Sequence, residues 1–77
     1  MTDRRKFESA LFEPVVRATI ETGETTTSFV QRRFGLEYGS ASRIVDRMCA
    51  EGVVSDELPD RSRVVLLTLE DWHRRNA

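Results

Sequence analysis

Hydrophobic positions along the chain repeat first with a helical period and then with an extended one. From about residue 10 to residue 52, apolar side chains recur every three or four residues, as in amphipathic helices that pack one side against a core. After Gly52, residues 53–55 and 64–67 are rich in amino acids that favour strands, and turn-forming residues 58–62 lie between them. The pattern therefore predicts helices followed by a small β-hairpin.

Two helices are predicted before residue 35. The first spans about residues 10–21 with Ser9 as its N-cap, and Pro14 falls in or just after its first turn. The second spans about residues 28–34, where Ser28 and Gln31 match a capping box, and the three threonines before it could form a very short strand. Their core sides are formed by Leu11, Phe12, Val15, Val16, Thr19 and Ile20 in the first helix and by Phe29, Val30 and Phe34 in the second.

A third helix with two unlike faces is predicted within the stretch of residues 36–52, where residues 36–38 make the connection to the second helix. Its core side is a stripe of Ala41, Ile44, Val45 and Met48. Its opposite side is short, polar and mixed in charge, with Gly39, Ser40, Arg43, Asp46 and Arg47. Gly52 follows the last periodic residue and can end the helix in the left-handed conformation. Two helices joined by a short turn with glycine are typical of a helix-turn-helix, whose second helix enters the major groove of DNA.

Three helices followed by a hairpin predict a winged helix-turn-helix, a mainly α fold in which residues 56–63 form the wing. A last helix over residues 69–76, capped by Thr68 and docked through Leu69 and Trp72, can follow the second wing strand. The expected organisation is a flexible N-terminal tail at residues 1–8, a winged-helix domain at residues 9–68 and a C-terminal segment at residues 69–77.

Length and composition narrow the function classes. A chain of 77 residues holds one domain, and its single cysteine excludes an intramolecular disulfide, which favours the reducing cytoplasm. The sequence has no apolar run that could span a bilayer and no signal peptide at its start. His73 and Cys49 stand at unrelated places, so we expect no metal site, no cofactor and no enzymatic activity.

Charge is distributed unevenly. The formal net charge is -1, from 12 Lys and Arg against 13 Asp and Glu, whereas nucleic-acid-binding domains are usually basic. Residues 31–47 nevertheless hold four arginines against Glu37 and Asp46, a local excess of two positive charges. Because phosphate attraction acts over about 8–10 Å at ordinary salt, this local excess matters more than the sum.

Candidate DNA contacts follow from this reading. Arg43, one turn into the third helix, is the foremost candidate for a base or phosphate contact. Gly39, Ser40 and Ser42 lie at the helix start, where N–H groups and hydroxyls can receive a phosphate, although the serines could equally be capping residues. Arg47 could contact DNA or pair with Glu51 four residues later. Further phosphate contacts are expected from Arg32 or Arg33, and from Arg61 and Arg63 on the wing, although acidic neighbours oppose the last two.

The sequence resembles the C-terminal gamma domain of the FtsK/SpoIIIE DNA translocases. The resemblance rests on the runs Val30-Gln31-Arg32-Arg33-Phe34, Ala41-Ser42-Arg43-Ile44-Val45 and Glu51-Gly52-Val53-Val54, and it extends from about residue 11 to residue 66. It implies a winged helix that reads a short, oriented DNA sequence in chromosome segregation, directs a hexameric motor and contacts a tyrosine recombinase. Where the family pattern has Tyr-Asn-Arg-Ala-Ala-Arg, this chain keeps Tyr38 and Arg43 but has Gly39 and Ser40 in place of the base-reading asparagine and first arginine.

Two functions are therefore weighed. The first is binding of double-stranded DNA, either as the recognition domain of an FtsK-like translocase or as a small stand-alone relative, since the sequence holds no phosphate-loop motif of a motor. The second is a protein-interaction module, such as a regulator or inhibitor from a phage or other mobile element, whose partner would be a recombinase, a motor or another target. The near-neutral charge, the altered start of the third helix and the acidic wing favour the second.

Overall fold

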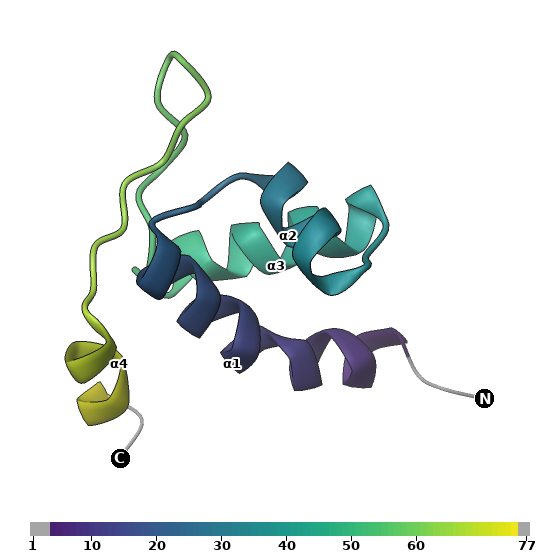
Figure 1. The fold of residues 1–77 in the computed structure, drawn as a ribbon, viewed down its shortest axis with the longest axis horizontal. Coiled ribbons are helices and arrows are strands. Elements are labelled where there is room, and N and C mark those ends of the chain that lie inside the picture. Colours follow the sequence, from purple (N-terminus) through teal and green to yellow (C-terminus); the bar gives the residue numbers. More distant parts are fainter. Residues whose placement is uncertain (1–3, 76–77) are drawn as a thin grey trace.

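The computed structural model describes residues 4–75 and, from residue 9 onward, their side chains. Within this range the chain forms four helices, α1 (Arg4–Thr22), α2 (Thr27–Phe34), α3 (Tyr38–Ala50) and α4 (Leu69–Arg75). Helix α3 packs against both α1 and α2, α4 lies against α1, and a loop projects from this body between α3 and α4 (Figure 1). The mainly helical fold that the sequence predicts is confirmed.

Helix α1 begins earlier than expected. It starts at Arg4 instead of Ala10, so residues 4–8 of the expected tail are helical, Ser9 lies inside the helix, and residues 1–3 fall outside the described part. Pro14 is then an interior residue, which leaves the carbonyl of Ala10 without its helical donor and costs about 3 kcal/mol where nothing compensates. Pro14 is exposed, so water can serve that carbonyl.

The start of α2 is capped by a different hydroxyl from the one expected. Thr26 is the N-cap, with extended backbone, and its Oγ1 accepts a hydrogen bond of 3.0 Å from the N–H of Phe29. The predicted capping box of Ser28 and Gln31 is therefore wrong, because Ser28 already lies inside the helix. The threonines before α2 form no strand; Thr25 is buried instead and donates its hydroxyl to the carbonyl of Arg63.

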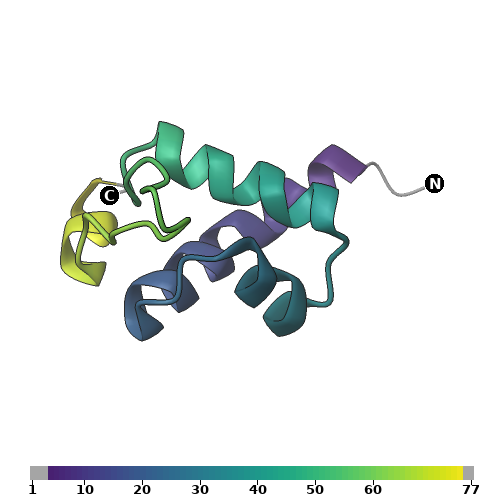
Figure 2. The same ribbon diagram turned by 90° about the horizontal axis from the view of Figure 1, so that it is seen from above.

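Helix α3 shows the predicted apolar stripe and ends as predicted. Ala41, Ile44, Val45 and Met48 are all buried, and Gly52 has a φ of +78°. The N–H of Gly52 donates to the carbonyl of Cys49, and the N–H of Val53 donates to that of Met48. These two hydrogen bonds form a Schellman motif. Figure 2 shows these helices from above, with α3 packed against both α1 and α2.

The predicted β-hairpin is not formed as two strands in the described chain. Its arms are extended and meet in a single antiparallel bridge between Val54 and Val65, flanked by bonds from Ser55 N–H to the Val64 carbonyl and from Leu66 N–H to the Val53 carbonyl, both 2.8 Å. We call residues 55–64 the projecting loop. Val53 and Val54 at its base are buried, so the base joins the core while the tip stands in solvent.

Helix α4 closes the core at the end of α1. It has the predicted cap, in which Thr68 Oγ1 accepts from the N–H of Asp71 while Asp71 Oδ2 accepts from the N–H of Thr68, and it is described as far as Arg75. Trp72 is buried and meets Phe12 edge to face, with 6.0 Å between ring centroids. The guanidinium of Arg75 donates to the carbonyl of Glu51, which ties α4 to the end of α3.

Candidate nucleic-acid interface

One side of α3 is left open by the rest of the fold. Gly39, Arg43 and Asp46 are exposed and Ser42 is half-buried, on the side opposite the buried stripe. Ser42, Arg43 and Asp46 stand three, four and seven residues after Gly39, which places the four residues in one row along the helix. We call these four residues the α3 stripe. A row of this kind is what a helix needs if it is to place side chains along the edges of successive base pairs.

Arg43 leans toward the start of α3. Its Nη2 lies 3.4 Å from Oγ of Ser40, and a Cβ atom added to Gly39 would lie 3.5 Å from its Nη1. The missing side chain at Gly39 therefore leaves room beside the guanidinium. The first turn of α3 thus presents a cation next to the N–H groups at the helix start, both of which attract anions.

Ser40 does not belong to the exposed side. Its relative exposure is 7%, so the prediction that it lies on the polar face is wrong. It follows the buried stripe instead, because it stands one residue before Ala41 and four before Ile44. Neither serine is the cap of α3, since Glu37 occupies that position without a side-chain capping bond. Ser40 is therefore buried beside Arg43, whereas Ser42 keeps partial exposure.

Arg47 is turned away from the α3 stripe. Its Nε bonds to Oε2 of Glu51 at 2.8 Å, and its guanidinium carbon lies 3.9 Å from the centroid of the Phe12 ring on α1. The alternative in which Arg47 pairs with Glu51 is thus the one present in the structure. Because the side chain keeps about half of its exposure, the pair itself contributes only a few tenths of a kcal/mol.

The two arginines of the projecting loop differ in setting. Arg61 is exposed at the tip, where its own φ is +68°. Arg63 has a side chain only 15% exposed, donates from Nη1 to the carbonyl of Ser55 at 3.1 Å, and places Nη2 3.9 Å from Oδ1 of Asp46. Of the two, Arg61 alone presents its side chain to solvent at the tip, and the expectation that Arg63 reaches out to phosphates does not fit its burial.

The acidic residues of the projecting loop are partly engaged by the loop itself. Asp60 accepts from both the N–H and the hydroxyl of Ser62, and these bonds lower the pKa of its carboxyl group. Asp56 accepts from the thiol of Cys49 at 3.1 Å, and this bond to a carboxylate raises the pKa of the thiol. Cys49 is half-buried, as expected of a small apolar side chain, and it links the loop to α3.

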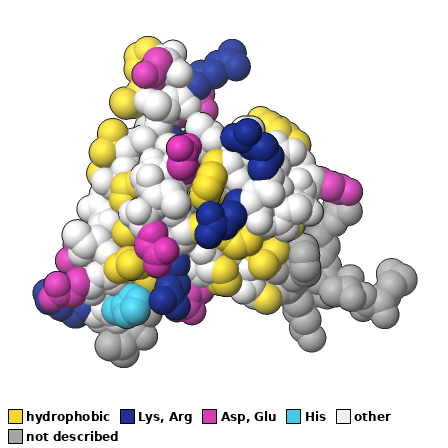
Figure 3. Space-filling view, viewed as in Figure 1, with side chains coloured by type: hydrophobic (Ala, Val, Ile, Leu, Met, Phe, Trp, Pro, Cys, Tyr) yellow, Lys and Arg dark blue, Asp and Glu magenta, His cyan; other side chains and the backbone are white. Residues whose placement is uncertain are grey.

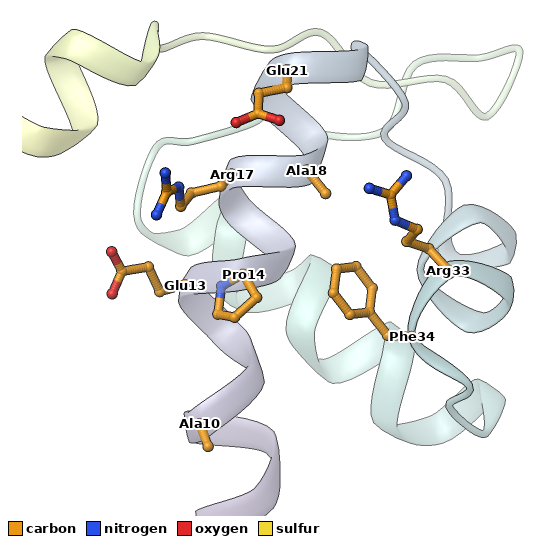
Figure 4. A pocket seen from close by; sticks show the side chains of 8 residues that line it. All are labelled: Ala10, Glu13, Pro14, Arg17, Ala18, Glu21, Arg33 and Phe34. Carbon is orange, nitrogen blue, oxygen red and sulfur yellow. The ribbon is translucent and has the colours of Figure 1, made fainter.

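Arg32 and Arg33 are exposed on α2. Arg33 and Phe34 point toward α1 and line an open groove of about 620 Å³ between the two helices (Figure 4). The face formed by α1 and α2 mixes basic, acidic and apolar side chains (Figure 3). Arg33 therefore belongs to a surface without a clear preference for anions, which leaves Arg32 as the better phosphate candidate on α2.

Two residues of the open surface were missed by the sequence reasoning as candidate contacts. Asp46 has a side chain 70% exposed and completes the α3 stripe seven residues after Gly39. Tyr38, the first residue of α3, is 67% exposed. The helical spacing places Asp46 on the polar side of the helix, and its carboxylate can accept a hydrogen bond from a base amino group, which makes it a candidate contact.

Other kinds of site find no support in residues 4–75. Among them, no group of three or more His, Cys, Asp and Glu side chains is placed to hold a metal ion. In the same range, no helix combines the length and the apolar character that crossing a bilayer requires.

Comparison with known proteins identifies the family. The family described as the Ftsk gamma domain matches residues 6–68, which include all of α2, α3 and the projecting loop. The DNA translocase SftA of Bacillus subtilis is 38% identical over 66 residues, which cover 86% of this chain and 7% of that protein. The DNA translocase FtsK of Haemophilus ducreyi is 41% identical over 56 residues, covering 73% of this chain and 6% of that protein. The chain thus spans less than a tenth of the length of these relatives, and it belongs to the FtsK gamma domain family.

Proposed function

We propose that this domain binds double-stranded DNA with α3 in the major groove and reads a short, oriented sequence, as the DNA-recognition domain of an FtsK-type translocase. The observation that carries the proposal is the open α3 stripe, which combines a cation, a carboxylate, a hydroxyl and a glycine on the exposed side of the second helix of a helix-turn-helix. The names of the relatives, all DNA translocases, support the same partner. The projecting loop takes the place of the wing.

Each member of the α3 stripe has a role in this proposal. Arg43 donates to the O6 and N7 acceptors of a guanine, the commonest base contact of arginine. Asp46, one turn later, accepts from the amino group of a cytosine or an adenine and disfavours bases that present only acceptors there. Gly39 lets the backbone at the helix start approach the groove closely, and Ser42 bonds to a base edge or a phosphate.

Phosphate contacts come from outside the stripe. Arg32 on α2 and Arg61 at the tip of the projecting loop lie on different elements beside α3 and can hold the two flanks of the groove. With two or three phosphates neutralised, the logarithm of the affinity should fall with the logarithm of the salt concentration at a slope of roughly -2 to -3. The net charge of -1 keeps binding to random sequence weak.

Orientation follows from the asymmetry of one domain. Helix α3 carries Arg43 in its first half, whereas the projecting loop lies beside its second half, near Asp46 and Cys49. A single domain therefore makes different contacts at the two ends of its site, and the sequence that it prefers has no two-fold symmetry. The motor that such a sequence would direct lies outside this segment in the proposed arrangement.

The test is a fluorescence-anisotropy titration of labelled duplexes at about 50 mM salt, after selection of preferred sites from a random duplex library. We expect a selected site without two-fold symmetry and a loss of about 1–3 kcal/mol for Arg43→Ala, which removes a bidentate base contact. Arg74→Ala on α4, where Arg74 pairs with Glu70, is the matched control and should bind like the parent. Equal binding by the parent and Arg43→Ala, or no binding of any duplex at tens of micromolar protein, would refute the proposal.

A further inference from the structure

Arg63 joins three segments that are distant in sequence. Its backbone carbonyl accepts the hydroxyl of Thr25 from the connection before α2 at 3.1 Å. Its guanidinium donates to the carbonyl of Ser55 on the opposite arm of the projecting loop at 3.1 Å. The same guanidinium lies 3.9 Å from a carboxylate oxygen of Asp46 on α3. Arg63 thus holds the base of the loop through its backbone and its side chain, and its guanidinium faces the α3 stripe.

The burial of Arg63 separates it from an arginine that binds phosphate. Its side chain is 15% exposed, whereas the Asp46 side chain that it faces is 70% exposed. To reach a phosphate, Arg63 would have to leave the carbonyl of Ser55, and a partly buried carbonyl that loses its donor is costly. The guanidinium is therefore fixed, and the carboxylate beside it keeps one side open toward solvent.

We propose that Arg63 is a positioning residue for DNA reading, which orients Asp46 and fixes the projecting loop relative to α3, and that it does not itself contact DNA. This inference rests on the proposed function, since it assigns Arg63 a part in reading by the α3 stripe. Three features of the Arg63 environment carry it: the bond to Ser55, the approach to Asp46 and the low exposure.

The arrangement has two consequences for recognition. A fixed cation beside Asp46 offsets part of the repulsion between its carboxylate and the phosphates on either side of the groove. The same cation draws one carboxylate oxygen toward the loop and leaves the other to accept from a base amino group. Because Cys49 also bonds to Asp56 in the loop, the loop and the second half of α3 are joined at two places and would dock on DNA as one unit.

The experiment is a double-mutant cycle between Arg63 and Asp46 in the full chain, with base preference as the readout. Titrations of single-base-pair variants of the selected site give the discrimination at each position, and Asp46→Ala identifies the base pair that Asp46 reads. We expect Arg63→Met to lower discrimination at that base pair by about threefold or more and to add no further loss in the Asp46→Ala background. Arg63→Lys, which keeps the charge, should restore part of the discrimination.

Salt dependence separates positioning from phosphate contact. Arg63→Met should keep the slope of affinity against salt of the parent, whereas Arg61→Met, the matched control at the exposed tip, should make the slope less steep by about 0.9. Should Arg63→Met change the slope like Arg61→Met and leave base preference intact, Arg63 contacts a phosphate and the inference is wrong. Independent effects of Arg63 and Asp46 at the base pair would also overturn it.

Two further results have a clear interpretation: an unfolded Arg63→Met variant and a parent chain that binds no duplex. If circular dichroism shows that Arg63→Met is unfolded, Arg63→Gln replaces it, because glutamine keeps a donor for Ser55 and lacks the charge that faces Asp46; the same loss supports the inference and unchanged discrimination refutes it. A parent chain that binds no duplex refutes the proposed function and this inference together. A parent chain that binds, with no coupling in the cycle, refutes this inference alone.

Discussion

Replacing Trp72 by alanine is expected to destabilise the domain by about 3 kcal/mol. The Trp72 side chain is 4% exposed and contacts Phe12 edge to face. A buried tryptophan removes about 150–250 Å² from water, worth roughly 4–6 kcal/mol at about 25 cal/mol per Å². Measured losses for Trp→Ala are about 3–5 kcal/mol, and we take the lower end because α4, only 7 residues long, can detach instead of leaving a cavity.

Such a loss is large for this chain. A domain of 77 residues has a free energy of unfolding of about 4–12 kcal/mol. Urea denaturation followed by far-UV circular dichroism measures the loss, and with an m-value near 1 kcal/mol/M the midpoint should fall by about 3 M. Trp72→Phe, which keeps a ring against Phe12, should lose only about 1 kcal/mol. His73→Ala, at the exposed neighbour, should stay within about 0.5 kcal/mol.

A small effect of Trp72→Ala would contradict the docking of α4 through Trp72. If Trp72→Ala changes the free energy of unfolding by no more than His73→Ala does, then the contact between Trp72 and Phe12 does not hold α4 on α1. In that case α4 would be an independent appendage and Phe12 would be covered by other residues of the core.

Two further predictions concern helix caps. Thr26→Ala should lower the free energy of unfolding by about 1 kcal/mol, because the N–H of Phe29 loses its acceptor. Ser28→Ala, inside α2, should lower it by less than about 0.5 kcal/mol. Urea denaturation of both variants decides which hydroxyl is the cap. Hydrogen bonding from the backbone N–H of Thr68, and then from its side chain, lowers the pKa of the Asp71 carboxyl group, so the stabilisation from the charged carboxylate is present above the ordinary carboxyl pKa and is lost as pH falls through the lowered one. Thermal melts between pH 7 and pH 2 should show a smaller acid-induced drop for Asp71→Asn than for the parent, and equal drops would contradict this.

The helical part of the fold was predictable because burial follows a period that the sequence displays. The buried apolar side of α3 is predicted correctly by its three- and four-residue steps, and so are the end of α3 at Gly52 and the cap of α4 at Thr68. The predicted place of Ser40 on the polar side is wrong, because Ser40 stands four residues before the buried Ile44 and therefore faces the core.

The errors at helix starts come from competing local signals. Four consecutive hydroxyl residues, two before α2 and two in its first turn, offer possible caps, and the choice among them depends on the burial of Thr25 against Arg63, a contact across 38 residues. At α1, Pro14 suggested a nearby start, whereas the charged residues before it are good helix formers and carry the helix back to Arg4. In both cases the local sequence permitted several starts.

The projecting loop and Arg63 show what sequence reasoning could not supply. Residues that favour strands did produce extended, antiparallel arms, but one bridge between Val54 and Val65 is too little pairing for a ladder. Arg63 and Arg61 stand two residues apart in the same basic and acidic context, so composition treats them alike. Only the fold distinguishes them, by turning one side chain inward to Ser55 and leaving the other in solvent.

The pairing of one cation with one carboxylate on the α3 stripe has a kinetic consequence for the proposed function. On random duplex, attraction at Arg43 and repulsion at Asp46 largely cancel, so each encounter should be brief and the domain should sample many sites in a short time. The residence time on DNA lengthens only at sites where the bases form hydrogen bonds with both Arg43 and Asp46. A DNA-reading domain of this kind would release non-preferred sequence quickly and would not slow a motor to which it is attached.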